Sequence, residues 1–134
     1  MQFSLKKMVL FGFTLALLLS ACKTATTVKD GATAYSLKQY SVAADLLVKE
    51  YNTEKDPVKK REKAFTIAES FRKYNDTKNA AEWYQKSMDL GNEMASFELG
   101  KMQMMNENYE DAIRSFTEFG KLSSASKLQA QREI

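Results

Sequence analysis

The stretch at residues 68–84, AESFRKYNDTKNAAEWY, carries the spacing that decides the fold class. A small residue, Ala68, comes first; Ala80 follows twelve residues later, and the bulky Tyr84 comes four residues after that. Two other stretches share this spacing, GATAYSLKQYSVAADLL at residues 31–47 and GKMQMMNENYEDAIRSF at residues 100–116. Their starts are 37 and 32 residues apart, and a period of this size predicts an array of helical repeats.

Composition also favours an all-α fold. The 134 residues include one proline and five glycines, and the part after residue 27 is rich in strong helix formers. Asp56 and Pro57 are a typical helix start, Asn108 is expected to cap a helix, and Gly91 and Gly120 suit helix ends. The pattern predicts helices over residues 28–38, 41–52, 57–74, 77–90, 93–105, 109–119 and 123–133.

The three aligned stretches resemble the tetratricopeptide family over most of residues 28–120, most clearly in YQKSMDLGN at 84–92 and NYEDAIRSF at 108–116. The resemblance implies about three antiparallel helix hairpins stacked as a short right-handed solenoid. The small, alanine and bulky positions are then where the two helices of a hairpin approach and cross. Thr27, Glu50 and Phe119 depart from the family pattern. The last predicted helix is either a terminal cap or the start of a further repeat, and Ile134 ends the chain without a helix stop signal, which points to a fragment of a longer protein.

The amino-terminal segment has the pattern of a secretory signal peptide. Lys6 and Lys7 precede an uncharged run of twelve residues, MVLFGFTLALLL at 8–19, and small residues follow it. A transmembrane helix is the alternative, but it needs about 20 apolar residues. Residues 1–21 are therefore predicted to be removed.

Residues 19–22, LSAC, resemble the lipobox of bacterial lipoproteins and contain the only cysteine, Cys22, so an internal disulfide is excluded. The resemblance implies that Cys22 carries a diacylglyceryl group and becomes the mature amino terminus. Acyl chains on one residue anchor a protein without a membrane span. Residues 22–30 then form a lipidated flexible tether and residues 31–134 the tetratricopeptide-repeat domain. In the lipoproteins of enterobacteria, Asp after the cysteine marks retention at the inner membrane. Lys23 stands at that position here, so the resemblance implies an outer-membrane location that faces the periplasm.

The sequence offers little for catalysis. It has no histidine, its glycines are scattered, and its one cysteine is assigned to lipid. The carboxylates Glu107 and Glu110 are expected to be solvated at a helix start. We therefore expect no enzyme activity, no metal site, no small-molecule substrate, and no cofactor beyond the acyl lipid. The formal charge of +3 falls to +1 for residues 22–134, with 18 basic and 17 acidic residues, which argues against nucleic-acid binding.

The remaining class is protein binding. In tetratricopeptide arrays the inner faces of the first helices of each hairpin line a groove, and carrying those positions over selects nine residues. Aromatic, charged and methionine side chains together suit an extended peptide. The alternative is that Met102, Met104 and Met105 fill the core and that Arg72 and Lys73 are solvated. The predicted groove consists of Tyr35, Phe65, Glu69, Arg72, Lys73, Phe97, Lys101, Met104 and Met105.

A lipidated leader followed by residues 64–91 and 97–119 resembles the amino-terminal part of OmpA-family lipoproteins of the PorE type, which belong to type IX secretion machinery. The resemblance implies a protein-binding scaffold or adaptor in a secretion or envelope assembly system, whose partners are envelope proteins or peptide segments. Two alternatives are a BamD-like lipoprotein that assembles outer-membrane proteins and a SusD-like helical lipoprotein that binds glycans.

Overall fold

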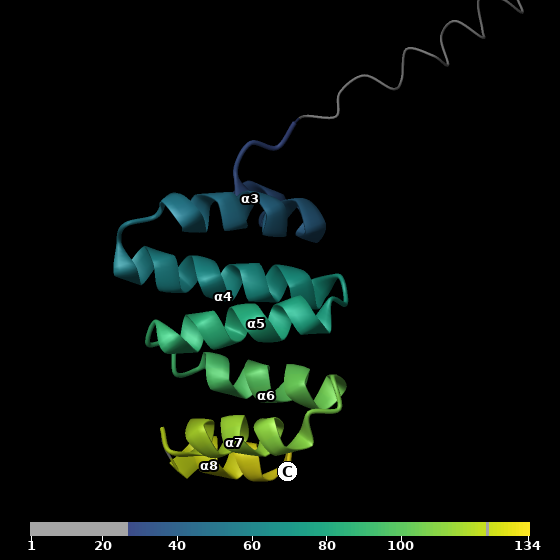
Figure 1. Cartoon of the computed structure of the whole chain (residues 1–134), viewed down its shortest axis with the longest axis vertical. Helices are drawn as coiled ribbons and strands as arrows, with labels where there is room; N and C mark the ends of the chain where they lie inside the picture. The colour runs from purple at the N-terminus through teal and green to yellow at the C-terminus, as the bar shows by residue number, and fades with distance from the viewer. Residues whose placement is uncertain (1–26, 123) are drawn as a thin grey trace, which may run out of the picture.

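The computed structural model describes residues 27–122 and 124–134, and this part of the chain is entirely helical. Residues 1–21 and Cys22, which carry the predicted signal peptide and lipid, lie outside the described residues. All seven predicted helices are present, with ends within three residues of the prediction. They are α2 (Gly31–Ser36), α3 (Tyr40–Thr53), α4 (Pro57–Lys73), α5 (Thr77–Asp89), α6 (Ala95–Met105), α7 (Tyr109–Gly120) and α8 (Ser124–Gln131) (Figure 1).

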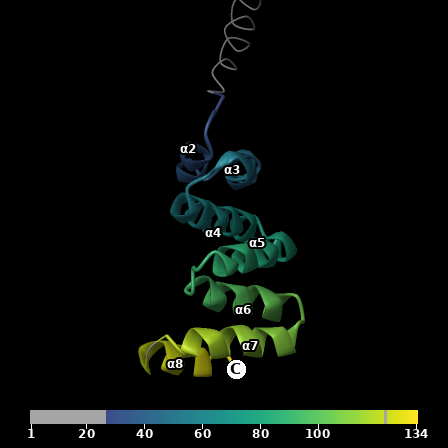
Figure 2. The same ribbon diagram turned by 60° about the vertical axis from the view of Figure 1, so that its left-hand side comes forward.

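The helices form an elongated stack. Helices α3 to α7 follow one another along the long axis, with α2 beside α3 at one end and α8 beside α7 at the other (Figures 1 and 2). Every extensive contact between described helices joins two that are consecutive in the chain. No described helix is long and apolar enough to cross a membrane.

Three of the described helices have an aspartate at the N-cap whose side chain accepts a backbone hydrogen bond. The Asp56 carboxylate accepts hydrogen bonds from the backbone N–H groups of Val58 and Lys59, at 2.9 and 3.2 Å, which confirms the predicted start of α4. Asp30 and Asp76 cap α2 and α5 in the same way. Asn108 occupies the N-cap position of α7, as predicted, but its side chain makes no cap hydrogen bond.

The same turn joins α2 to α3, α4 to α5 and α6 to α7. One residue in each turn has a left-handed backbone: Lys38, Asn75 and Glu107, with φ of 60°, 69° and 64°. In each turn that residue's N–H donates to the carbonyl three positions back, and the next N–H donates to the carbonyl five positions before it, which is the Schellman pattern. The turns are 37 and 32 residues apart, as are the sequence repeats. Gly91, with φ of 91°, makes the same hydrogen-bond pattern between α5 and α6, so it is the placement of the turns at Lys38, Asn75 and Glu107 that follows the repeat.

The aligned positions all lie in the interior, as the spacing predicted. An added Cβ at Gly31 would lie 2.3 Å from Cγ of Leu47, and one at Gly100 would lie 2.7 Å from Cε1 of Phe116. The small residue of a unit thus lets its helix touch the bulky residue sixteen positions later. The buried set is Gly31, Ala43, Leu47, Ala68, Ala80, Tyr84, Gly100, Ala112 and Phe116.

Candidate partner-binding groove

One face of α4 carries three side chains that neither fill the core nor point fully into solvent. Phe65, Glu69 and Arg72 are four and three residues apart, so they share a helix face, while Ala64 and Ala68 are buried. Side chains from α2 and α6 join them around a hollow of about 390 Å³. We call it the aromatic–charged hollow; it is lined by Tyr35, Phe65, Thr66, Glu69, Arg72 and Glu98.

A charged hydrogen-bond network forms part of this hollow. The Arg72 guanidinium donates from Nε to Oε1 of Glu69 at 3.0 Å and from Nη2 to Oε2 at 2.6 Å. The Tyr84 hydroxyl, on α5, donates to Oε1 of Glu69 and accepts from Nε of Arg72 at 3.2 Å. The Glu69 carboxylate therefore accepts three hydrogen bonds, which fixes the positions of both charged groups.

The network changes the proton affinities of its members. Burial raises the pKa of the Glu69 carboxyl, but hydrogen bonds from Arg72 and Tyr84 outweigh it and hold that pKa below its ordinary value. Burial and the hydrogen bond to Glu69 raise the pKa of the Tyr84 hydroxyl well above its usual range. At neutral pH the network thus consists of a carboxylate, a guanidinium and a neutral phenol.

A second ion pair lies at the α6 side of the hollow. Nζ of Lys101 is 3.1 and 3.3 Å from the two carboxylate oxygens of Glu98, and Oε2 of Glu98 is 4.0 Å from Nε of Arg72. Nζ of Lys101 also lies 5.5 Å from the centre of the Phe97 ring. The charged groups of α4 and α6 therefore form a continuous row of alternating sign.

The structure brings together some of the nine predicted groove residues. Tyr35, Phe65, Glu69 and Arg72 line the hollow, and Lys101 is beside it through Glu98. The other four do not line it. Phe97 packs against Phe116 and Phe119, with ring centres 5.7 and 4.9 Å apart.

The remaining three, Lys73, Met104 and Met105, are exposed away from the hollow. The alternative prediction, that the methionines fill the core, is confirmed only for Met102, which is 2% exposed.

Sequence reasoning missed Thr66, Glu98 and the hydroxyl of Tyr84. Glu98 precedes Lys101 by three residues, a spacing that places an acid and a base side by side on a helix. Tyr84 occupies the position that Leu47 and Phe116 hold in the other units, so packing there does not require a hydroxyl. A polar atom at an otherwise apolar repeat position was the available signal.

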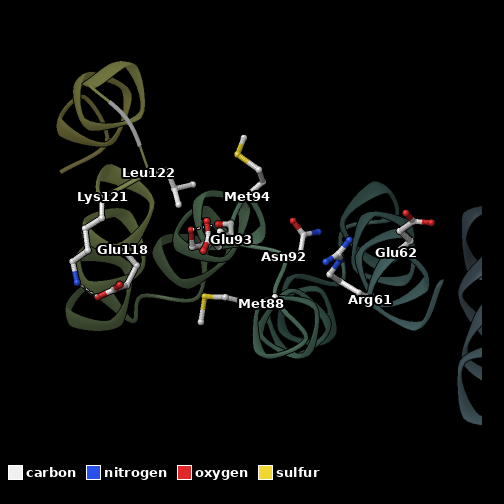
Figure 3. Close-up of a pocket in the computed structure, with 11 residues that line it drawn as sticks. Arg61, Glu62, Met88, Asn92, Glu93, Met94, Glu118, Lys121 and Leu122 are labelled. Carbon is white, nitrogen blue, oxygen red and sulfur yellow. Dashed lines mark hydrogen bonds and ion pairs between the residues drawn. The ribbon is translucent and has the colours of Figure 1, made fainter. Parts of the chain in front are cut away.

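A larger hollow, of about 1160 Å³, lies along the edge formed by the α5–α6 and α7–α8 connections. It contains none of the predicted groove residues. Figure 3 shows its side chains spread around the rim, with the Glu118–Lys121 ion pair at one side and Arg61 and Glu62 at the other. Because they do not converge on one point, we place the candidate site at the aromatic–charged hollow.

The other candidate chemistry is limited in the described part of the chain. No group of three or more His, Cys, Asp and Glu side chains in residues 27–122 and 124–134 is arranged to hold a metal ion. Glu107, in the α6–α7 turn, and Glu110, in the first turn of α7, are exposed, as expected. Comparison with protein-family models found no match to the chain, and no curated protein is significantly similar to it.

Proposed function

We propose that this protein is a membrane-anchored scaffold whose helical repeats bind an extended segment of another cell-envelope protein through the aromatic–charged hollow. The observation that carries the proposal is the convergence of Tyr35, Phe65, Glu69 and Arg72 on one hollow. These residues come from two helices and were selected by their repeat positions alone. Sites that bind peptides combine aromatic side chains, which pack against the peptide, with fixed charged groups, which orient it.

The proposed architecture is a short right-handed tetratricopeptide-like solenoid. Three features support it: the common spacing of small, alanine and bulky residues, the left-handed turns at equivalent positions, and extensive contacts only between consecutive helices of the described part of the chain. In such an array α2, α4 and α6 are the first helices of their hairpins. Their shared face supplies all six residues of the hollow.

The proposed location rests on the sequence of the leader. The lipobox at residues 19–22 supports lipidation of Cys22, and Lys23 after it supports an outer-membrane lipoprotein that faces the periplasm. With the resemblance to OmpA-family lipoproteins, this favours a role in a secretion or envelope assembly complex of the type IX kind. The protein would hold a partner there without catalysing a reaction.

Site-specific photo-crosslinking in intact cell envelopes tests the proposal. A photoreactive residue at Thr66, which lines the hollow, is compared with one at Thr117 on α7. The two threonines are matched, because each hydroxyl donates to the carbonyl four residues back, at 3.0 and 2.7 Å. We expect one discrete crosslinked envelope protein from position 66 and none from position 117. No crosslink at 66, or the same crosslinks at both positions, would refute the proposed groove.

A further inference from the structure

The charges at the aromatic–charged hollow are already balanced within the protein. Arg72 pairs with Glu69 through two hydrogen bonds, and Lys101 pairs with Glu98 at 3.1 Å. A charged partner side chain that enters this hollow would lose its hydration without meeting an unpaired opposite charge. Such a loss is costly, because desolvation of an ion is repaid only by a well-placed counter-ion.

The two aromatic side chains that line the hollow, Phe65 and Tyr35, each pack against another aromatic ring. The ring of Phe65 packs against Tyr84 with centres 5.5 Å apart, and Tyr35 packs against Tyr40 at the same distance. Both walls are partly buried, so they retain surface toward the hollow while their rotamers are restricted. A preordered apolar wall gains contact with a partner at little further cost in side-chain entropy.

Arg72 keeps hydrogen-bonding capacity at the edge of the hollow. Its Nε and Nη2 atoms donate to Glu69, while Nη1 donates to no residue in the described part of the chain. Arginine can only donate, so this nitrogen suits an oxygen acceptor, and because Glu69 already balances the charge of Arg72, a neutral peptide carbonyl is sufficient. The hollow therefore offers apolar walls to a side chain and a donor to the backbone beside it.

From these features we infer that the hollow receives an uncharged aromatic side chain of an extended segment, and that acidic and basic side chains are rejected. This inference rests on the proposed function and adds the chemical class of the partner residue. It has a consequence for ionic strength: because no net charge is exchanged on binding, salt has little effect on affinity.

A set of blocked pentapeptides tests the inference on the full lipidated protein in detergent micelles. The peptides are N-acetyl-Gly-Ser-Xaa-Ser-Gly-amide, with Phe, Lys, Glu or Ala as Xaa. Binding is followed by the NMR resonance of the Arg72 Nε–H group, at salt concentrations of about 50 and 500 mM. Thr66→Trp, which fills the hollow, is compared with the matched Thr117→Trp.

We expect the Phe peptide to bind at least about tenfold more tightly than the Ala peptide, since burial of an aromatic ring is the main gain. We also expect its Kd to change less than about twofold with salt, and Thr66→Trp alone to abolish binding. Tighter binding of the Lys or Glu peptide, with strong salt dependence, would overturn the inference and leave the crosslinking result intact. Absence of binding by all four peptides would also overturn it, whereas failure of the Thr66 crosslink is what refutes the proposed function.

Discussion

Replacement of Tyr84 by Phe removes one hydroxyl from the centre of the charged network and changes little else. Tyr84 is fully buried, and its ring packs against Phe65. Phe116 occupies the corresponding position of the last repeat, so a phenyl ring is compatible with the packing there. The substitution therefore isolates the hydrogen bonds of the hydroxyl to Glu69 and Arg72.

The expected loss in the free energy of unfolding depends on the hydrogen bonds that Glu69 and Arg72 keep in the variant. A hydrogen bond to a charged group contributes about 1.5–3 kcal/mol to stability. Glu69 keeps both bonds from Arg72 in the variant, so its carboxylate is not left unpaired and the loss belongs at the low end, near 1.5 kcal/mol. For a domain of this size the Tm should fall by roughly 6–12 °C.

The pH dependence of this cost separates the hydrogen bonds from packing. The pKa of Glu69 is lowered in the folded protein, so its stabilising contribution is present at neutral pH and is lost as acid protonates the carboxylate. The pKa of Tyr84 is raised, so that contribution is present below its ordinary pKa near 10 and is lost as pH rises above it. The gap in unfolding free energy between wild type and Tyr84→Phe should therefore be widest near neutral pH and narrow toward both extremes.

Denaturant unfolding across this pH range is the assay, and Tyr51→Phe is the control. The Tyr51 ring packs edge-on against Trp83 at 4.9 Å, but its hydroxyl makes no hydrogen bond with the described residues. Tyr51→Phe should change stability by less than about 0.5 kcal/mol at every pH. Equal, pH-independent losses in the two variants would refute the assignment of the network to Tyr84.

Three further predictions concern other parts of the chain. Glu107→Gly should raise the free energy of unfolding in urea by about 1 kcal/mol, because a left-handed backbone strains a residue that has a Cβ atom. Asn75→Gly should gain less, because asparagine tolerates this conformation better than glutamate. No gain at Glu107 would contradict the turn geometry. Ala80→Trp overpacks a fully buried position and should lower the free energy of unfolding by about 1–3 kcal/mol or more. Ala32→Trp, at an exposed site, should leave the Tm nearly unchanged. Equal Tm values for the two variants would argue against the repeat register. Cys22→Ala should abolish metabolic labelling with a radioactive fatty acid, and undiminished labelling would remove the basis for the proposed anchor.

The helices could be predicted closely because their signals are local. Asp56 and Pro57 set a helix start through one cap and one fixed backbone angle, and the interior alanines mark where helices touch. The left-handed turns at Lys38 and Glu107 could not be predicted in this way, because neither residue type favours that conformation.

The candidate site could be predicted only in part. Repeat position selected the residues of α2 and α4 that line the hollow, because equivalent positions of successive helices share a face. It did not select against Phe97, since the packing of that ring against Phe119 depends on a contact between two helices. The hydroxyl of Tyr84 was missed for a related reason, because its hydrogen bonds to Glu69 and Arg72 depend on the packing of α5 against α4.

The most direct test of the proposed groove is the affinity of the envelope protein crosslinked at Thr66 for two variants of the full lipidated protein. Thr66→Trp fills the aromatic–charged hollow, and Thr117→Trp places the same side chain on the exposed surface of α7. If the hollow is the binding site, the Kd for Thr66→Trp rises at least about tenfold, and the Kd for Thr117→Trp stays within about twofold of wild type. Equal affinity of both variants would contradict the account and place the interface elsewhere.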